Sequence, residues 1–268
     1  MSDQAASALG ARRGSALRQW LLAGLLLVIV SPAAAAPLKV AVASNFLAPL
    51  EALAEVYRQQ GGPALQISAG ATGQLYAQIT QGAPYDVFLA ADQARPQRLV
   101  SEGTALTGSR MTYARGRLVL WARPGVELPA DGLAGLQRPS VTRLAIANPA
   151  LAPYGRAARE ALQATGQWSA LSDRVIQGQN VGQALQYLAT GNVSHALVAA
   201  SYTRLENRPA GDYQRVAGRL HAPIRQDAVI LAGSASADQA RAFLAFLRGP
   251  AAADVLAAFG YRAAGPSP

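Results

Sequence analysis

Short apolar segments alternate with amphipathic segments along this chain, and this alternation constrains the fold more than any other feature. Residues Leu38–Val42 predict a strand, and apolar residues then recur at helical spacing from Leu50 to Tyr57. Strands alternating with helices are typical of α/β proteins with parallel sheets. Further strands are predicted at Leu65–Ser68, Asp86–Ala90, Leu118–Ala122, Arg143–Ala147, Arg174–Gln177, Ala196–Ala199 and Gln226–Ala232.

The N-terminal segment has the pattern of a secretory signal peptide, which we expect to cover residues 1–36. Arg12, Arg13 and Arg18 precede the apolar run Trp20–Val30, and Ala34–Ala36 offers an Ala-x-Ala cleavage site. The run is about eleven residues, against the ~20 that span a bilayer, so we do not expect a membrane anchor. The chain has no cysteine, which excludes disulfides and lipid attachment at a processed cysteine. We therefore expect a soluble protein exported to the periplasm by the ordinary secretory route.

The chain is basic, with a formal net charge of +9 at pH 7. A positive excess of this size attracts anions at long range. Nucleic-acid binding is not indicated, because export argues against it and the arginines are not clustered with aromatic residues. The arginines in the middle of the chain stand singly, at Arg95, Arg98, Arg110, Arg115, Arg117 and Arg123.

Four turns between a strand and a helix share a polar, uncharged character: Ala43–Asn45, Ser68–Gly73, Asn148–Gly155 and Gly178–Val181. Turns of this kind lie at the carboxyl ends of strands, where α/β sheets bind ligands. Each opens a helix whose first N–H groups lack intrahelical partners and carry partial positive charge. Several such helix ends aimed at one point predict an anion site.

The same residues have simpler interpretations. Ser44, Asn45 and Thr72 are ordinary helix N-cap residues, and capping alone accounts for them with ~1 kcal/mol each. Tyr154 also fits a surface aromatic at a helix start, and Val181 a plain core residue. No single turn decides between these interpretations and a binding site.

Catalytic motifs are absent from the sequence, so an enzyme is not expected. There is no G-x-S-x-G elbow, no Walker GK[ST] and no G-x-G-x-x-G. His195 and His221 lie outside the four turns without metal-ligand spacing, which favours structural or exposed roles. We interpret Asp86 as a turn or hinge partner and not as a general base.

Several runs resemble the periplasmic molybdate-binding proteins, the soluble receptors of ABC importers. They extend from Leu38 to about Arg262 and are LKVAVASNFLAPLEALA, SAGATGQLYAQITQGAPYDVFLAADQ, GRLVLWARPG, LAIANPALAPYGRAAREAL, NVGQAL and FLRGPAAADVLAAFGY. The resemblance implies a receptor for molybdate and tungstate, without a cofactor. It also implies an ABC transporter permease as the partner, and we expect a monomer.

The site that the resemblance implies falls on residues of the four turns. Ser44 and Asn45 match a loop that contacts the anion through its hydroxyl and backbone N–H groups. Thr72 matches a hydroxyl residue, Tyr154 a tyrosine used by one branch of the family, and Val181 a backbone N–H donor. Metal is expected only as the molybdate or tungstate oxyanion held by these residues, with no direct cation ligands.

The chain departs from the family pattern at two places. Another branch takes its tyrosine from a later strand, where this chain has Ala199 and the nearest tyrosine is Tyr202. We therefore expect Tyr154 to contribute the hydroxyl. Thr72 stands where many relatives have serine, which keeps the hydroxyl and adds a methyl group.

The resemblance implies an α/β chain with the type II periplasmic-binding-protein fold, in which two α/β lobes are joined by a two-crossing hinge. The crossings are expected near Thr112–Arg115 and Asp227–Ile230. Residues 38–113 with 230–268 would form lobe 1, and residues 114–229 lobe 2. The anion would bind in the cleft between the lobes, and a hinge motion would close them on it.

The uncharged donors explain why such a site would select molybdate and tungstate. Both ions are fully deprotonated dianions at neutral pH, so every oxygen accepts and the site must present donors. A same-fold receptor for sulfate, thiosulfate or an organic acid remains the nearest alternative. A remote alternative is an enzyme of similar fold such as hydroxymethylbilane synthase, but that enzyme attaches its cofactor through cysteine.

Overall fold

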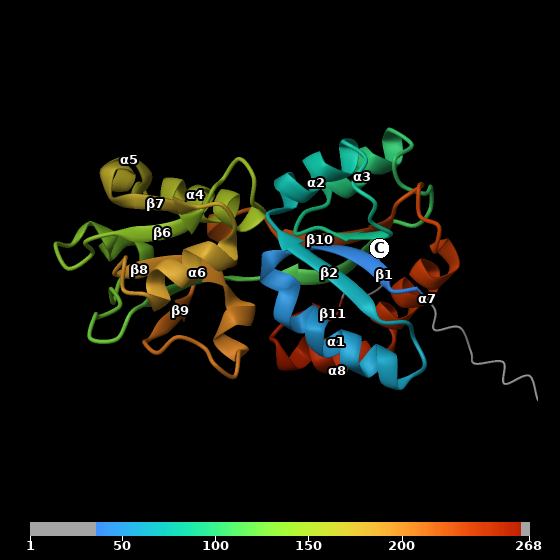
Figure 1. Cartoon of the computed structure of the whole chain (residues 1–268). Coiled ribbons are helices and arrows are strands. Elements are labelled where there is room, and N and C mark those ends of the chain that lie inside the picture. The colour runs from blue at the N-terminus through green and yellow to red at the C-terminus, as the bar shows by residue number, and fades with distance from the viewer. Residues whose placement is uncertain (1–35, 264–268) are drawn as a thin grey trace, which may run out of the picture. The chain divides into compact units, whose positions relative to one another are not determined.

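The computed structural model describes residues 36–263, which form two sheets with flanking helices (Figure 1). The six-stranded sheet has the order β11-β4-β10-β3-β1-β2, and the five-stranded sheet has the order β7-β6-β8-β5-β9. The predicted signal peptide, residues 1–36, lies outside the described residues apart from its last position. The strands are β1 (Leu38–Ala43), β2 (Leu65–Gly70), β3 (Val87–Leu89), β4 (Met111–Gly116), β5 (Leu118–Ala122), β6 (Leu144–Ala147), β7 (Val175–Gly178), β8 (His195–Ala199), β9 (Tyr213–Arg215), β10 (Ile224–Ile230) and β11 (Arg262–Ala263).

Helices cover both sheets, so the expected α/β class is confirmed. Figure 1 shows α2 and α3 on one side of the six-stranded sheet and α1 and α8 on the other. Among residues 36–263, no helix combines the length and apolar composition that a membrane crossing requires. The α-helices are α1 (Leu47–Gln59), α2 (Thr72–Thr80), α3 (Ala94–Ser101), α4 (Pro153–Ala164), α5 (Trp168–Leu171), α6 (Val181–Ala189), α7 (Ala237–Arg248) and α8 (Pro250–Ala258). The short 3-10 helices are η1 (Ser44–Phe46), η2 (Gly132–Gln137), η3 (Ser172–Arg174), η4 (Ala200–Arg204) and η5 (Gly218–Leu220).

The sheets are mixed, so the expectation of parallel sheets is wrong in part. β1 pairs in parallel with β2 and β3, and β6 with β7 and β8. β10 is antiparallel to β3 and β4, and β5 is antiparallel to β8 and β9. β10 returns from the other sheet and enters at the end where β1 to β3 finish, so it must run against them.

The chain passes between the sheets twice. β4 ends at Gly116 in the six-stranded sheet, and β5 begins at Leu118 in the five-stranded sheet. The return passage leads from β9 to β10. The predicted crossing segments, Thr112–Arg115 and Asp227–Ile230, lie within strands β4 and β10. The lobe boundaries stay a prediction.

The apolar cores follow the two sheets. Two clusters pack on the six-stranded sheet, one with α1, α7 and α8 and the other with α2 and α3. The third cluster surrounds the five-stranded sheet. It also includes Ala43, the last residue of β1, and Ala71 and Ala91, which follow β2 and β3. The carboxyl ends of these strands therefore pack against the core of the five-stranded sheet.

His195 is fully buried in β8 and makes stability depend on pH. Its Nδ1 lies 3.0 Å from Ser194 Oγ, and its Nε2 lies 3.2 Å from the Glu127 carbonyl oxygen. Burial lowers the pKa of His195 below its ordinary value of 6.5, although the bond to Glu127 opposes this. The folded state then binds fewer protons than the unfolded state, so stability is present above about pH 6.5 and is lost as the pH falls through the lowered pKa.

We expect His195→Gln to flatten this dependence. Urea unfolding at a series of pH values from neutral to mildly acidic measures the free energy of unfolding of both proteins. The wild type should lose more of it on acidification than the variant, because glutamine does not titrate. His221→Gln is the control, since His221 is partly exposed and bonds only the neighbouring Ala222 carbonyl oxygen among the described residues. The prediction would be contradicted if the free energy of unfolding changed equally with pH in the wild type and in His195→Gln.

Candidate binding site

The four predicted turns lie at the carboxyl ends of β1, β2, β6 and β7. Loops from the two sheets meet there. The Gly73 backbone N–H donates to the Leu151 carbonyl oxygen at 2.8 Å, joining α2 to the turn after β6. The Tyr202 hydroxyl donates to the Ser44 carbonyl oxygen at 3.1 Å, joining the turn after β8 to the turn after β1.

The first turn holds Ser44 and Asn45 in η1, directly after β1. Ser44 is partly exposed and lies beside the start of α6: a Cβ added to Gly182 would stand 3.8 Å from the Ser44 Cβ. Asn45 is buried, and its amide donates to Gln226 Oε1 at 2.8 Å and to the Tyr261 hydroxyl at 2.9 Å. The Asn45 side chain is thus occupied within the fold, which leaves its backbone N–H as the donor for a ligand.

Thr72 is the first residue of α2 and is 1% exposed. Its Oγ1 accepts the Ala91 backbone N–H at 3.0 Å. A hydroxyl that accepts in this way keeps its own proton to donate. The N-cap position is Ala71, so the capping interpretation does not apply to Thr72.

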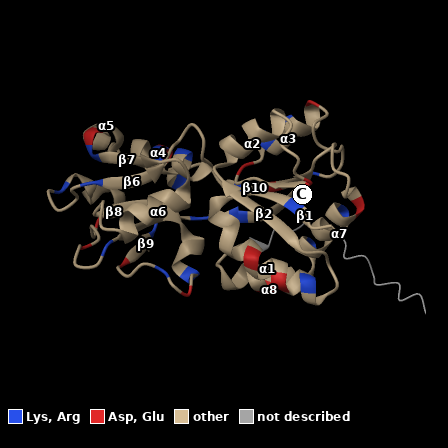
Figure 2. Cartoon of the chain, in the orientation of Figure 1, with Lys and Arg blue, Asp and Glu red and all other residues tan. Residues whose placement is uncertain are grey.

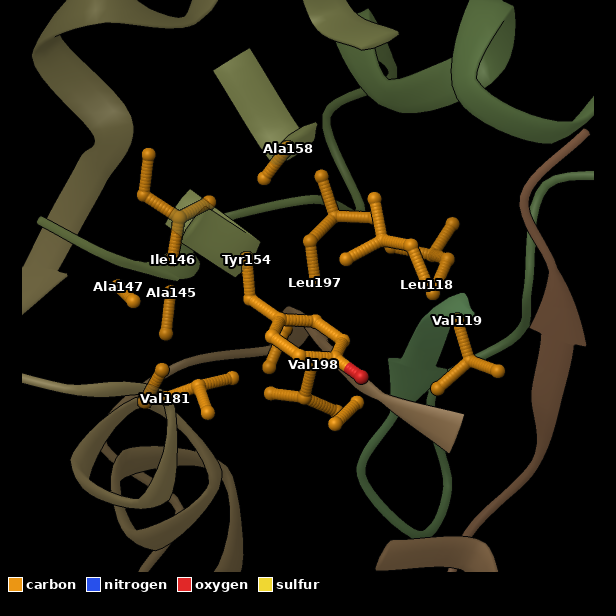
Figure 3. Packing of buried hydrophobic residues seen from close by; sticks show 14 of the residues in the cluster. Leu118, Val119, Ala145, Ile146, Ala147, Tyr154, Ala158, Val181, Leu197 and Val198 are labelled. Carbon is orange, nitrogen blue, oxygen red and sulfur yellow. The ribbon is translucent and has the colours of Figure 1, made fainter. Parts of the chain in front are cut away.

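Tyr154 is the second residue of α4 and is 1% exposed, so the surface interpretation is wrong. Figure 3 shows its ring among the apolar residues of the five-stranded sheet, with the hydroxyl on the side of Val119. The hydroxyl is buried and makes no well-formed hydrogen bond within the described residues, and the Tyr261 hydroxyl is its polar neighbour. Burial, and next the neighbouring Tyr261, raise the pKa of Tyr154 well above its ordinary value of 10.0, so it stays a neutral donor.

Gly116 and Gln226 face the Tyr154 hydroxyl from the two passages between the sheets. A Cβ added to Gly116 would overlap the Tyr154 hydroxyl and stand 3.1 Å from Gln226 Nε2. Gln226 is fully buried, and its Nε2 has no hydrogen-bond partner among the described residues. Two buried donors without a well-formed hydrogen bond therefore lie around one point beside Gly116, both near the Tyr261 hydroxyl.

Val181 is the first residue of α6 and is buried, as the core interpretation expects. Asn180 occupies the N-cap, and its side chain accepts the Gln183 backbone N–H at 3.0 Å. The first N–H groups of the helix, at Val181 and Gly182, have no intrahelical acceptor. Because Gly182 lies beside Ser44, these N–H groups and the first turn are close together.

The loops carry little free negative charge. Among the described residues at this end of the six-stranded sheet, Asp92 follows β3 and is paired with Arg95, whose Nη1 lies 2.5 Å from Asp92 Oδ2. Arg95 Nη2 also donates to the Ala150 carbonyl oxygen at 3.2 Å. Asp86 accepts the Lys39 backbone N–H at 2.8 Å, in keeping with its expected role as a turn partner.

Sequence reasoning missed the residues that hold the first turn. Ser201 and Tyr261 donate to the Asn45 carbonyl oxygen at 2.9 and 3.0 Å. The Tyr113 hydroxyl lies 3.1 Å from the Ala90 carbonyl oxygen and 3.3 Å from Gln226 Oε1. One available signal is Gln226, a polar residue on the same face of β10 as the apolar Ile224, Ala228 and Ile230. Tyr261 lies in the final FGY run, which carries the family resemblance but does not by itself indicate a contact with Asn45.

Comparisons with known proteins agree with this architecture. The family model described as bacterial extracellular solute-binding protein matches residues 38–262. The molybdate-binding protein ModA of Azotobacter vinelandii is 42% identical over 87% of this chain and 93% of its own length. ModA of Rhodobacter capsulatus is 38% identical over 88% of this chain and 92% of its own length.

Solved structures share the fold. The periplasmic molybdate-binding protein of Azotobacter vinelandii matches with a TM-score of 0.79 at 38% identity, over 84% of this chain and 98% of that chain. The sulfate-binding protein SubI of Mycobacterium tuberculosis matches with a TM-score of 0.68 over 86% of this chain and 88% of that chain. Its identity is 15%, so this likeness concerns the fold alone. The fold that the resemblance implied is confirmed.

Proposed function

The chain belongs to the bacterial extracellular solute-binding proteins, and from this premise we propose that it binds molybdate and tungstate and delivers them to an ABC transporter. Relatives at 42% and 38% identity carry the name molybdate-binding protein, which supports the choice of ligand. The receptor acts in the periplasm after loss of residues 1–36, as a monomer that hands its ligand to a permease. We assign it a receptor role without catalysis, in which molybdate is the transported ligand and not a cofactor.

The observation that carries the proposal is the set of neutral donors at the loops. The Thr72 hydroxyl keeps a proton to donate, and the buried Tyr154 hydroxyl makes no well-formed hydrogen bond within residues 36–263. Ser44 and the backbone N–H groups of Asn45 and Val181 complete the proposed set. A tetrahedral dianion accepts at every oxygen, and each bond to a charged acceptor contributes ~1.5–3 kcal/mol.

The ligand is held between two lobes in this proposal. Residues 38–113 with 230–268 supply Ser44, Asn45 and Thr72, and residues 114–229 supply Tyr154 and Val181. Strands β4 and β10 act as the hinge because they lead into and out of the five-stranded sheet. A ligand that contacts both lobes favours the closed state by its differential affinity for that state.

Hydrogen phosphate and sulfate test the selectivity. Hydrogen phosphate carries a proton that needs an acceptor, and the five proposed ligand residues include no carboxylate. We expect tight binding of molybdate and tungstate and weak binding of phosphate in titration calorimetry. At a hundredfold excess over Kd, molybdate should raise the free energy of unfolding by about 2.7 kcal/mol. Equal affinity for sulfate and molybdate would replace the proposal by a general oxyanion receptor.

A further inference from the structure

A basic pocket lies beside the two passages between the sheets. It has a volume of about 540 Å³ and is lined by Arg115 and Arg117 at the first passage. Arg215, His221 and Arg225 line it from the return passage. No Asp or Glu lines the pocket. Figure 2 shows most Lys and Arg residues scattered singly, but with basic residues on the connection from β4 to β5.

Two of these arginines face each other across a strand pair. Arg225 of β10 is the direct Cα partner of Arg115 of β4. Like charges placed opposite each other destabilise a sheet, and both residues are exposed. Arg115, Arg215 and Arg225 form no ion pair with any described residue. The repulsion between Arg115 and Arg225 is therefore uncompensated within the described part of the chain, and an anion between them would relieve it.

The arginines of the pocket point away from the proposed molybdate site, although Gly116 lines the pocket and also faces Tyr154. Successive side chains of a strand point to opposite faces. Gly116 and Gln226 face the buried Tyr154 hydroxyl, so their neighbours Arg115 and Arg225 point away from it. The five proposed molybdate ligands do not line the basic pocket.

We propose that this pocket binds a small organic polyanion, one with two or more carboxylate or phosphate groups. Its volume lies in the range of ~300–1,000 Å³ that is usual for sites of small organic ligands. The walls combine arginines, which bind carboxylate and phosphate in bidentate geometry, with Val216, Pro223 and Ile224, which contact a carbon skeleton. A polyanion would bridge Arg115 and Arg225 of the six-stranded sheet to Arg215 of the five-stranded sheet.

Citrate and fructose 1,6-bisphosphate are the probes, titrated calorimetrically into the full mature protein at low ionic strength. We expect saturable binding of one equivalent of at least one probe. The double variant Arg115→Gln/Arg225→Gln should weaken it at least about tenfold, since each lost charged bond is worth that factor. Its melting temperature without ligand should equal or exceed that of the wild type, because the repulsion is gone.

The control is Arg58→Gln/Arg138→Gln, which removes the same charge at exposed ion-paired positions. It should keep the wild-type affinity for the probe. Equal weakening of probe binding in both double variants would show that net charge alone causes the effect, and it would overturn the proposal.

Absence of probe binding, or displacement of the probe by molybdate, would also overturn the proposal. Binding of acidic peptides but of neither probe would make the surface a protein-docking site instead. Molybdate affinity is measured in a separate titration, so the result for the basic pocket is independent of the result for the proposed molybdate site.

Discussion

Gly116→Ala is expected to weaken molybdate binding roughly 10- to 100-fold, which corresponds to the loss of one hydrogen bond to a charged acceptor. The new Cβ would overlap the Tyr154 hydroxyl and stand 2.9 Å from Tyr154 Cζ. Tyr154 is 1% exposed and enclosed by the core of the five-stranded sheet, so it cannot move aside without a packing cost. Such overpacking usually lowers the free energy of unfolding by ~1–3 kcal/mol. Calorimetric titration and urea unfolding measure the two effects.

Gly233→Ala is the matched control for Gly116→Ala. A Cβ added to Gly233 meets no atom of the described chain within 4 Å, so both affinity and stability should remain near wild type. The double variant Gly116→Ala/Tyr154→Phe separates the two effects, because it removes the atom that the new methyl group overlaps. It should regain only part of the stability, since Cζ still lies 2.9 Å from the new Cβ, and it should bind no better than Tyr154→Phe alone. Wild-type affinity in Gly116→Ala would remove Tyr154 from the proposed site.

Thr72→Val is the second change with a large expected effect. Valine keeps the shape of threonine but cannot donate to the anion, so we expect molybdate affinity to fall roughly 10- to 100-fold. The structure adds a consequence for stability. Thr72 Oγ1 accepts the buried Ala91 N–H at 3.0 Å, and leaving that group unpaired costs ~1–3 kcal/mol. The fold is therefore expected to be weakened as well as the binding.

Thr72→Ser is the conservative control. Serine keeps both the acceptor for Ala91 and the proton for the ligand, so its molybdate affinity should stay within a fewfold of wild type. Calorimetry at a temperature well below the melting point of every variant keeps unfolding from contributing. If Thr72→Val lost stability but kept its affinity, the hydroxyl would serve the fold alone and Thr72 would leave the proposed set.

Local pattern was sufficient to predict most elements of the fold. The helical spacing from Leu50 to Tyr57 matches α1, and the predicted strand Leu118–Ala122 has the same bounds as β5. The sequence pattern does not predict β4, β9 and the two-residue β11. In β4, exposed Arg115 and partly exposed Gly116 interrupt the apolar pattern, and β9 is a three-residue strand without buried residues. Pairing with neighbouring strands makes these segments extended, and a sequence pattern does not report such partners.

The sequence by itself determined the α/β class, the four polar turns and the absence of acidic residues among the five proposed ligands, because strand and helix periodicity and side-chain chemistry are local properties. Only the tertiary structure decided that Asn45 is occupied by Gln226 and Tyr261, and that the Tyr154 hydroxyl lies against Gly116. Asn45 and Tyr261 are 216 positions apart in the chain. Contacts of that separation depend on how the chain passes between the two sheets, and no local pattern contains that information.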